Sequence, residues 1–198
     1  MKKSTIITAI CAIAATVFAA EIDFNGGFEK CSPDKSGVPQ PSFWNKTRTI
    51  SKKAECRLVK DAECVKSGTF SLMAETEEGG YFFFRSLKEI PVLEGDTIEF
   101  ELYAKGSGKY NVQYIAYGAD DPKKMVFLTT MGTGRDAVAK EEEWSKLYRK
   151  FKFTPPAKAK GKFTKFTIIP VIIAHANAEL YFDDFSLKIN APAPEAAK

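Results

Sequence analysis

The chain has 198 residues, with 29 lysines and arginines against 25 aspartates and glutamates and a formal net charge of +4. A charge so close to balance gives no reason to expect a nucleic-acid partner, which a strongly basic surface would indicate. The single histidine, His175, excludes a metal site built from several histidines, and no G-x-S-x-G segment offers a hydrolase nucleophile. We therefore expect a protein that is not an enzyme.

Residues 1–20 are typical of a secretory signal peptide. A basic start at Lys2 and Lys3 precedes an apolar run over 6–20, which ends in small residues suited to cleavage after Ala19 or Ala20. The apolar run is shorter than the roughly 20 residues that a membrane-spanning helix needs. The sequence thus predicts a secreted protein (extracellular, periplasmic or on the cell surface) with no membrane span after processing.

Three cysteines follow the signal peptide, namely Cys31, Cys56 and Cys64. In an oxidising compartment two of them could pair and leave one thiol over. The sequence leaves all three pairings open. It contains no C-x-x-C segment, so neither a redox motif nor a zinc knuckle is indicated.

From residue 21 onward the chain alternates between short strand-like segments and turn residues. Aromatic and branched residues dominate the segments, and glycine, proline and aspartate stand between them. This pattern, without a sustained helical period, predicts an all-β sandwich or barrel. A helix or a loop could form at 135–144, and the Ala/Pro-rich residues 191–198 read as a flexible tail. The expected strands lie within 81–87, 96–104, 110–117, 124–130, 146–154, 163–174 and 180–189.

The last of these segments carries two adjacent carboxylates, Asp183 and Asp184, among apolar neighbours. With regular alternation, Asp183 shares a face with three large side chains, those of Tyr181, Phe185 and Leu187, and points inward. Asp184 then points outward. An inward acid needs a cation, backbone N–H groups or buried water. Calcium would serve, because it binds oxygen ligands and needs no histidine.

Six segments follow one another in a familiar order: "NGGFE" (25–29), Trp44, "KSGTFSL" (66–72), "EGDTIEFELYAKGSG" (94–108), "EEWSKLYRKFKFTPPA" (142–157) and "LYFDDFSL" (180–187). Together they resemble the extracellular carbohydrate-binding modules of families 4 and 9, over nearly all of residues 21–190. The resemblance implies a galactose-binding-like fold, a two-sheet antiparallel jelly-roll sandwich. It also implies that the tryptophans, Trp44 and Trp144, pack in the core.

The resemblance further implies a structural calcium ion between the first and last strands. Glu29 and Asp183 would be its ligands, with Asp184 as the alternative and a carbonyl from the Ser67–Gly68 turn contributing. The competing interpretation is that these carboxylates accept hydrogen bonds from backbone, lysine or arginine groups.

Modules of this kind bind sugars with aromatic rings that stack on the pyranose, while polar groups fix the hydroxyls. Two strands offer that mixture on a face turned away from the core. Our candidates for carbohydrate binding are Tyr81, Phe83, Arg85, Asn111, Gln113 and Tyr117.

The sequence as a whole therefore predicts a secreted, non-catalytic module that binds polysaccharide. A partner glycoside hydrolase could lie on a separate chain. The alternative is a structural or cell-surface interaction module with the same fold and no glycan binding.

Overall fold

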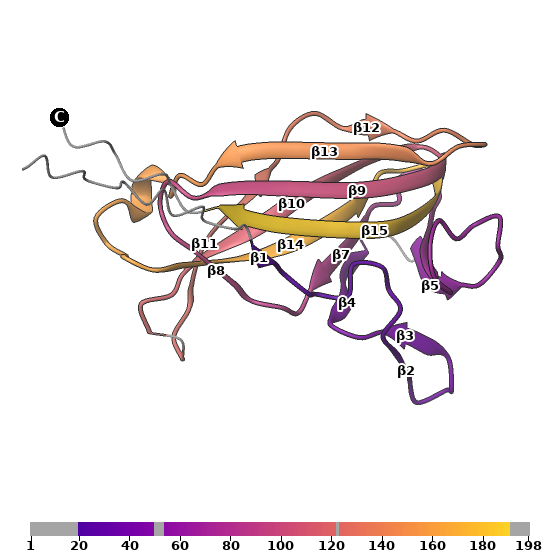
Figure 1. Ribbon diagram of the computed structural model, residues 1–198, viewed down its shortest axis with the longest axis horizontal. Helices are drawn as coiled ribbons and strands as arrows, with labels where there is room; N and C mark the ends of the chain where they lie inside the picture. Colours follow the sequence, from indigo (N-terminus) through magenta and orange to yellow (C-terminus); the bar gives the residue numbers. More distant parts are fainter. Residues whose placement is uncertain (1–19, 50–53, 122, 191–198) are drawn as a thin grey trace, which may run out of the picture.

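Two antiparallel sheets packed face to face make up the computed structural model, which describes residues 20–49, 54–121 and 123–190 (Figure 1). The predicted all-β jelly-roll sandwich is confirmed. The only helical segment among the described residues is a 3-10 turn, Ala157–Ala159. Ala20, the last residue of the predicted signal peptide, opens strand β1; residues 1–19 and the predicted tail, 191–198, lie outside the described residues.

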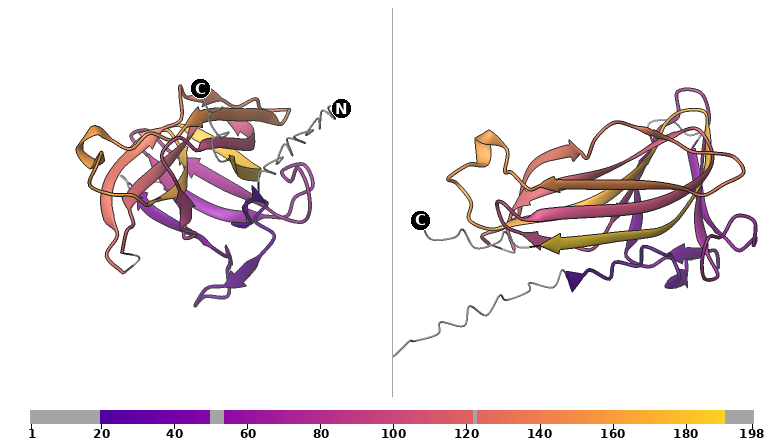
Figure 2. Two further views of the ribbon diagram at one scale, coloured as in Figure 1. Left: turned by 60° about the vertical axis from the view of Figure 1, so that its left-hand side comes forward. Right: turned by 45° about the horizontal axis from the view of Figure 1, so that its top comes forward.

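The six-stranded sheet has the order β13-β9-β15-β6-β5, with β1 paired to β15. Its three longest strands run side by side in the right-hand view of Figure 2. The bounds are β1 Ala20–Glu21, β5 Ala54–Val59, β6 Ser71–Thr76, β9 Thr97–Ser107, β13 Ser145–Lys152 and β15 Ala178–Asn190.

The seven-stranded sheet has the order β11-β10-β14-β7-β4, with β12 paired to β10 and β8 paired to β14. A separate two-stranded ribbon joins β2, Cys31–Pro33, to β3, Pro39–Pro41. The bounds in the sheet are β4 Trp44–Thr49, β7 Phe82–Ser86, β8 Ile90–Val92, β10 Lys109–Gly118, β11 Val126–Gly132, β12 Ala137–Val138 and β14 Phe166–Ala174.

The predicted strands are present, and the ambiguous segment 135–144 forms β12 and turns. Alternation along the strands builds the core: in β9, residues 98, 100, 102 and 104 are buried and the intervening side chains are half-exposed. Strand β14 is different, because every one of its residues is buried. Trp44 stacks on Phe84 in the core with ring centroids 5.1 Å apart, as expected, whereas Trp144 is half-buried ahead of β13.

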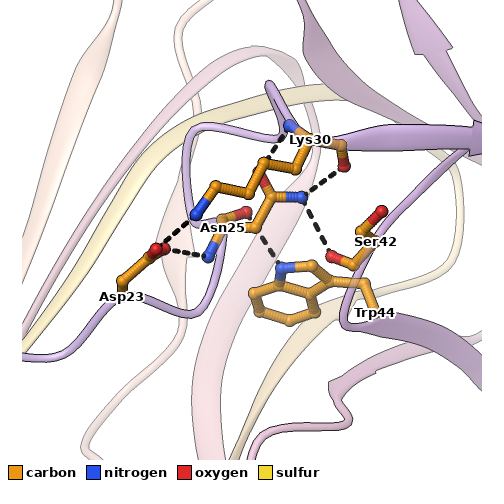
Figure 3. Close-up of polar contacts among 5 residues, drawn as sticks. All are labelled: Asp23, Asn25, Lys30, Ser42 and Trp44. Carbon is orange, nitrogen blue, oxygen red and sulfur yellow. Dashed lines mark hydrogen bonds and ion pairs between the residues drawn. The ribbon is translucent and has the colours of Figure 1, made fainter.

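The first turn of the sandwich is organised by a buried amide, that of Asn25 (Figure 3). Its Nδ2 donates to the carbonyls of Lys30 and Ser42 at 2.7 and 2.9 Å, and its Oδ1 accepts from the Lys30 amide at 2.8 Å. The indole N–H of Trp44 donates to the Asn25 carbonyl at 3.1 Å. Asn25 also has a positive φ of 60°, which asparagine tolerates better than most residues. The "NGGFE" segment and Trp44 are thereby joined.

None of the three disulfide pairings that the sequence allows is formed, because Cys31 and Cys64 are both free thiols. Cys31 is exposed and Cys64 is half-buried. Among the described residues, no helix has the length and apolar character to cross a membrane.

Candidate functional site

The three acids predicted to bind calcium lie near one another, and Asp183 is fully buried. Its Oδ2 accepts hydrogen bonds from the backbone amides of Lys66 and Ser67 at 2.9 and 3.1 Å. Its Oδ1 accepts from the Asp184 amide at 2.7 Å. Backbone donors thus satisfy both oxygens of this carboxylate.

The other two acids also have donors, from the backbone for Glu29 and from side chains for Asp184. Glu29 Oε1 accepts from the amides of Thr69 and Phe70 at 2.9 and 3.0 Å. Asp184 pairs with the Lys66 ammonium group at 2.7 Å and accepts from Ser67 Oγ at 2.7 Å. Segments 25–29, 66–70 and 183–185, three of the segments that carry the family resemblance, therefore meet here.

These residues do not fit a calcium ion. Calcium needs several oxygen ligands, but both oxygens of Asp183 and Oε1 of Glu29 face N–H donors, and an ammonium group already neutralises Asp184. The Ser67–Gly68 turn offers its amide and hydroxyl to the acids, where the resemblance implied a carbonyl. Among the described residues, no three His, Cys, Asp or Glu side chains form a group able to hold a metal.

The predicted alternation of the last strand is wrong at one point. Leu180 and Phe182 face the core while Tyr181 is half-exposed, and beyond the acids it is Phe185 that faces inward. A bulge between Asp183 and Ser186 shifts the register against β9. Two residues, Asp184 and Phe185, occupy the place of one, and Asp184 takes a positive φ of 47°.

Two glycines make this close contact feasible. A Cβ on Gly26 would lie 1.7 Å from the Phe185 carbonyl oxygen, so the first turn can reach the bulge only without a side chain. Gly68 has φ +69°, and a Cβ there would meet Glu29 Oε1 at 2.5 Å.

A solvent-open pocket of about 620 Å³ lies beside the acids on the outer face of the six-stranded sheet. Three aromatic residues, Phe24, Tyr103 and Phe185, line this pocket, and Lys66 Nζ lies 4.0 Å from the centroid of the Tyr103 ring. Two ion pairs lie beside this pocket: Lys66 with Asp184 at 2.7 Å, and Lys146 with Glu101 at 2.5 Å.

The six residues predicted to bind carbohydrate lie on the other side of the molecule. Five of them, on β7 and β10, share the outer face of the seven-stranded sheet, and Tyr81 immediately precedes β7. The register joins them across β14: Asn111 and Phe83 flank Ile173, and Gln113 and Arg85 flank Val171. We call this surface the outer face; it comprises Tyr81, Phe83, Arg85, Asn111, Gln113, Ile115, Tyr117, Phe127, Thr167, Ile169, Val171 and Ile173.

Aromatic pairs stand at the two ends of the outer face. The rings of Tyr81 and Phe83 meet edge to face with centroids 4.6 Å apart. At the other end Tyr117 meets Phe127, on β11, with centroids 6.0 Å apart. Phe83 and Asn111 lie opposite the same residue of β14, so they are at the same height in the sheet. Tyr117 lies six residues further along β10 than Asn111, so the two aromatic pairs are about 20 Å apart.

Between the aromatic pairs lie Arg85 and Gln113, about 10 Å apart across two strand spacings. Both side chains are half-buried. Arg85 Nε is buried and has no hydrogen-bond partner among the described residues. Gly132 lies opposite Gln113 in the register, and a Cβ on Gly132 would meet only the Gln113 amide nitrogen and the Gly134 carbonyl oxygen, both at 4.0 Å.

The floor of the outer face is apolar and comes from β14. Val171 and Ile173 are 1% and 0% exposed although they point away from the core. The longer side chains of β7 and β10 on either side close over them. The sequence analysis missed these residues, because a run of nine buried residues gives no indication of which ones point outward.

Asn111 differs from the other predicted residues. It is 4% exposed, and its Nδ2 donates to the Gly134 carbonyl and to Asp136 Oδ1 at 3.1 and 2.9 Å, while its Oδ1 accepts from the Val112 amide. The amide is therefore committed to holding the 134–136 loop. Nε2 of His175, the single histidine of the chain, lies 3.3 Å from the same Asp136 oxygen.

No protein-family model and no curated protein matches the chain. Several solved structures are similar to it. The CBM22-1 xylan-binding domain of Xyn10C from Paenibacillus barcinonensis is 13% identical over 85% of this chain and 94% of that domain, with a TM-score of 0.50. The Stig cyclase Fisc from Fischerella sp. TAU, in complex with a 3H-indole compound, is 13% identical over 89% of this chain and all of that one, with a TM-score of 0.56.

The arabinose-bound α-L-arabinofuranosidase MgGH51 is 16% identical over 86% of this chain, which spans 26% of that protein, with a TM-score of 0.53. Identities this low establish the fold alone. The chain thus shares a two-sheet antiparallel β-sandwich fold with these structures, and its assignment to the carbohydrate-binding modules of families 4 and 9 stays a prediction.

The buried acid predicts a pH dependence of stability. Burial raises the pKa of Asp183 to about 6, against the lowering effect of the amides that bind it. The carboxyl of the unfolded chain has a pKa of about 3.9. Between about pH 4 and pH 6 the folded protein therefore holds a proton that the unfolded chain has lost, so the free energy of unfolding decreases as the pH rises. Urea denaturation from pH 4 to 6.5 should show this decrease in the wild type and not in Asp183→Asn; parallel curves would contradict it.

The hydrogen-bond donors around the three acids predict that calcium does not change the thermal stability of the protein. We expect the melting temperature to be the same in EDTA and in millimolar calcium, because N–H and ammonium groups already compensate the carboxylates. Differential scanning calorimetry of the wild type and of Glu29→Gln would check this. A melting temperature that falls on chelation and recovers with calcium, in the wild type alone, would place the ion at these residues after all.

Proposed function

We propose that this protein is a non-catalytic module that binds polysaccharide on the outer face of its seven-stranded sheet. The observation that carries the proposal is the arrangement of that face: two aromatic pairs about 20 Å apart, with the polar groups of Arg85 and Gln113 between them. Such a span suits several sugar units in a row.

The physical basis of the proposed binding is that the outer face combines aromatic rings with planar hydrogen-bond donors. Pyranose rings offer C–H faces that pack on aromatic rings, and their hydroxyls need hydrogen-bond partners when water is displaced. Arg85 and Gln113 are half-buried planar donors on this face, and the apolar floor of Val171 and Ile173 costs no polar desolvation. So few contacts would give dissociation constants from micromolar to millimolar, about −8 to −4 kcal/mol.

The likeness to a xylan-binding domain supports this choice of ligand class. The likeness to a cyclase is the reason to ask about catalysis. We infer binding because Asp136 and His175, an acid and a base beside the outer face, lie together at one end of it, where Asp136 holds the 134–136 loop through Asn111. Secretion through the signal peptide and a partner glycoside hydrolase on a separate chain complete the proposal.

Tyr117 and Tyr148 provide a matched pair of variants. Tyr117 belongs to an aromatic pair on the outer face, whereas Tyr148 is 45% exposed on β13 of the opposite sheet. We expect Tyr117→Ala to weaken retention on the bound polysaccharide at least tenfold, because it removes a stacking surface. Tyr148→Ala should bind like the wild type. Affinity electrophoresis against soluble polysaccharides measures both.

Both substitutions should leave the free energy of unfolding within about 1 kcal/mol of the wild type, as for changes at a surface. Equal retention of Tyr117→Ala and wild type would remove this ring from the site. Loss of retention in Tyr148→Ala alone would place binding on the six-stranded sheet instead.

A further inference from the structure

The two sheets differ sharply in charge. The strands of the seven-stranded sheet contain Lys46, Arg48, Arg85 and Lys109 and no aspartate or glutamate. The strands of the six-stranded sheet contain eight acidic and seven basic residues. A chain with almost equal numbers of acids and bases has thus placed every strand acid in one of its two layers.

On the six-stranded sheet the strand charges neutralise each other. Lys150 lies 2.9 Å from Glu99, and Lys146 lies 2.5 Å from Glu101. These pairs run between adjacent strands, β13 and β9, whose residues are directly opposed in the register. This sheet is balanced internally, so its outer face gives no net attraction to a charged ligand.

Arg85 has no such partner in the part of the chain that the structure describes. No hydrogen bond or ion pair joins its guanidinium to any described residue, and its Nε is buried. Arg149, by comparison, donates through Nη1 and Nη2 to two backbone carbonyls, those of Tyr148 and Arg135. A half-buried guanidinium beside the apolar side chain of Val171, without a partner, is costly unless a ligand supplies one.

Arg85 lies next to the aromatic pair of Tyr81 and Phe83, at one end of the outer face. Phe83 lies two residues before Arg85 on the same face, about 7 Å along the strand. A sugar ring stacked on Phe83 and Tyr81 would therefore carry a substituent within reach of the guanidinium. Asp136, whose charge acts on Tyr81 at this end, already interacts with Asn111 and His175.

We propose that the polysaccharide bound on the outer face is acidic, with uronate carboxylates that pair with Arg85. This inference rests on the proposed function and names its ligand class. A carboxylate is favoured over a sulfate because the planar fork of a guanidinium matches two carboxylate oxygens in one plane. Arg85 and Lys109, in a sheet whose strands contain no aspartate or glutamate, would also draw such a polymer toward this face.

The central comparison of the test is between polygalacturonate and the same polymer without its carboxylates, and two further polymers serve as controls. Affinity electrophoresis and titration calorimetry would be run with polygalacturonate, with the same polymer after carboxyl reduction, with neutral xylan and with dextran sulfate. The variants are Arg85→Gln, which keeps an amide donor without the charge, and Arg85→Lys, which keeps the charge without the fork. The matched control is Arg57→Gln, an exposed arginine on β5 of the other sheet.

We expect the wild type to bind polygalacturonate at least tenfold more tightly than its reduced form. Arg85→Gln should bind both forms alike, Arg85→Lys should fall between, and Arg57→Gln should match the wild type. The comparison of the two polymers on the wild type needs no variant, so it stands even if an Arg85 substitution impairs folding.

Equal affinity for the two polymer forms, or binding of neutral xylan alone, would overturn the acidic ligand and leave the proposed function standing. Preference for dextran sulfate over polygalacturonate would overturn the carboxylate in favour of general anion binding. Binding to none of the four polymers would overturn the inference and the proposed function together.

Discussion

A single buried carboxylate holds together the parts of this sandwich that lie farthest apart in the sequence. Asp183 belongs to the last strand, and its oxygens accept from amides at 66–67 and from its own neighbour. The bulge that positions it brings Phe185 against Gly26 of the first turn, whose carbonyl accepts from the Phe185 amide at 3.0 Å. The first turn in turn carries Asn25, which is bound to Trp44 and hence to β4. Beginning, middle and end of the chain are thus joined by hydrogen bonds to buried groups, which are costly to leave unmade.

The joined sandwich presents two unlike outer faces. The six-stranded sheet pairs its charges across strands, and the seven-stranded sheet has no strand acids and an apolar floor on β14. Because the flanking strands carry the longer side chains, Phe83, Arg85 and Gln113 stand on either side of that floor. A rigid sheet is a suitable support for such a ligand-binding surface, because it holds the side chains in fixed relative positions and little order has to be gained on binding. The rigid seven-stranded sheet is therefore what connects the fold to the proposed function.

The sequence predicted the sandwich well because period-2 alternation and turn residues are local signals, and both are strong here. It also placed Tyr81, Phe83, Arg85, Gln113 and Tyr117 on one face, since alternation within β7 and β10 sufficed.

The prediction from sequence failed where alternation is interrupted: the bulge at Asp184 reversed the facing of Tyr181, and no residue type marks a bulge by itself. Phe127, Val171 and the partners of Asn111 depend on the register between strands and on loop contacts, which pattern alone does not give. The calcium site was inferred from acids that a resemblance brought together, and their N–H partners come from backbone atoms that a sequence cannot display.

The central claim is that ligand binding occurs on the outer face of the seven-stranded sheet, and hydrogen–deuterium exchange of the protein with and without a soluble polysaccharide tests it most directly. The account predicts slower exchange in β7, β10 and β11 and in the 133–136 loop, with β9, β13 and β15 unchanged. Protection confined to β9, β15 and the 22–27 turn, around the pocket that contains Tyr103, would contradict it.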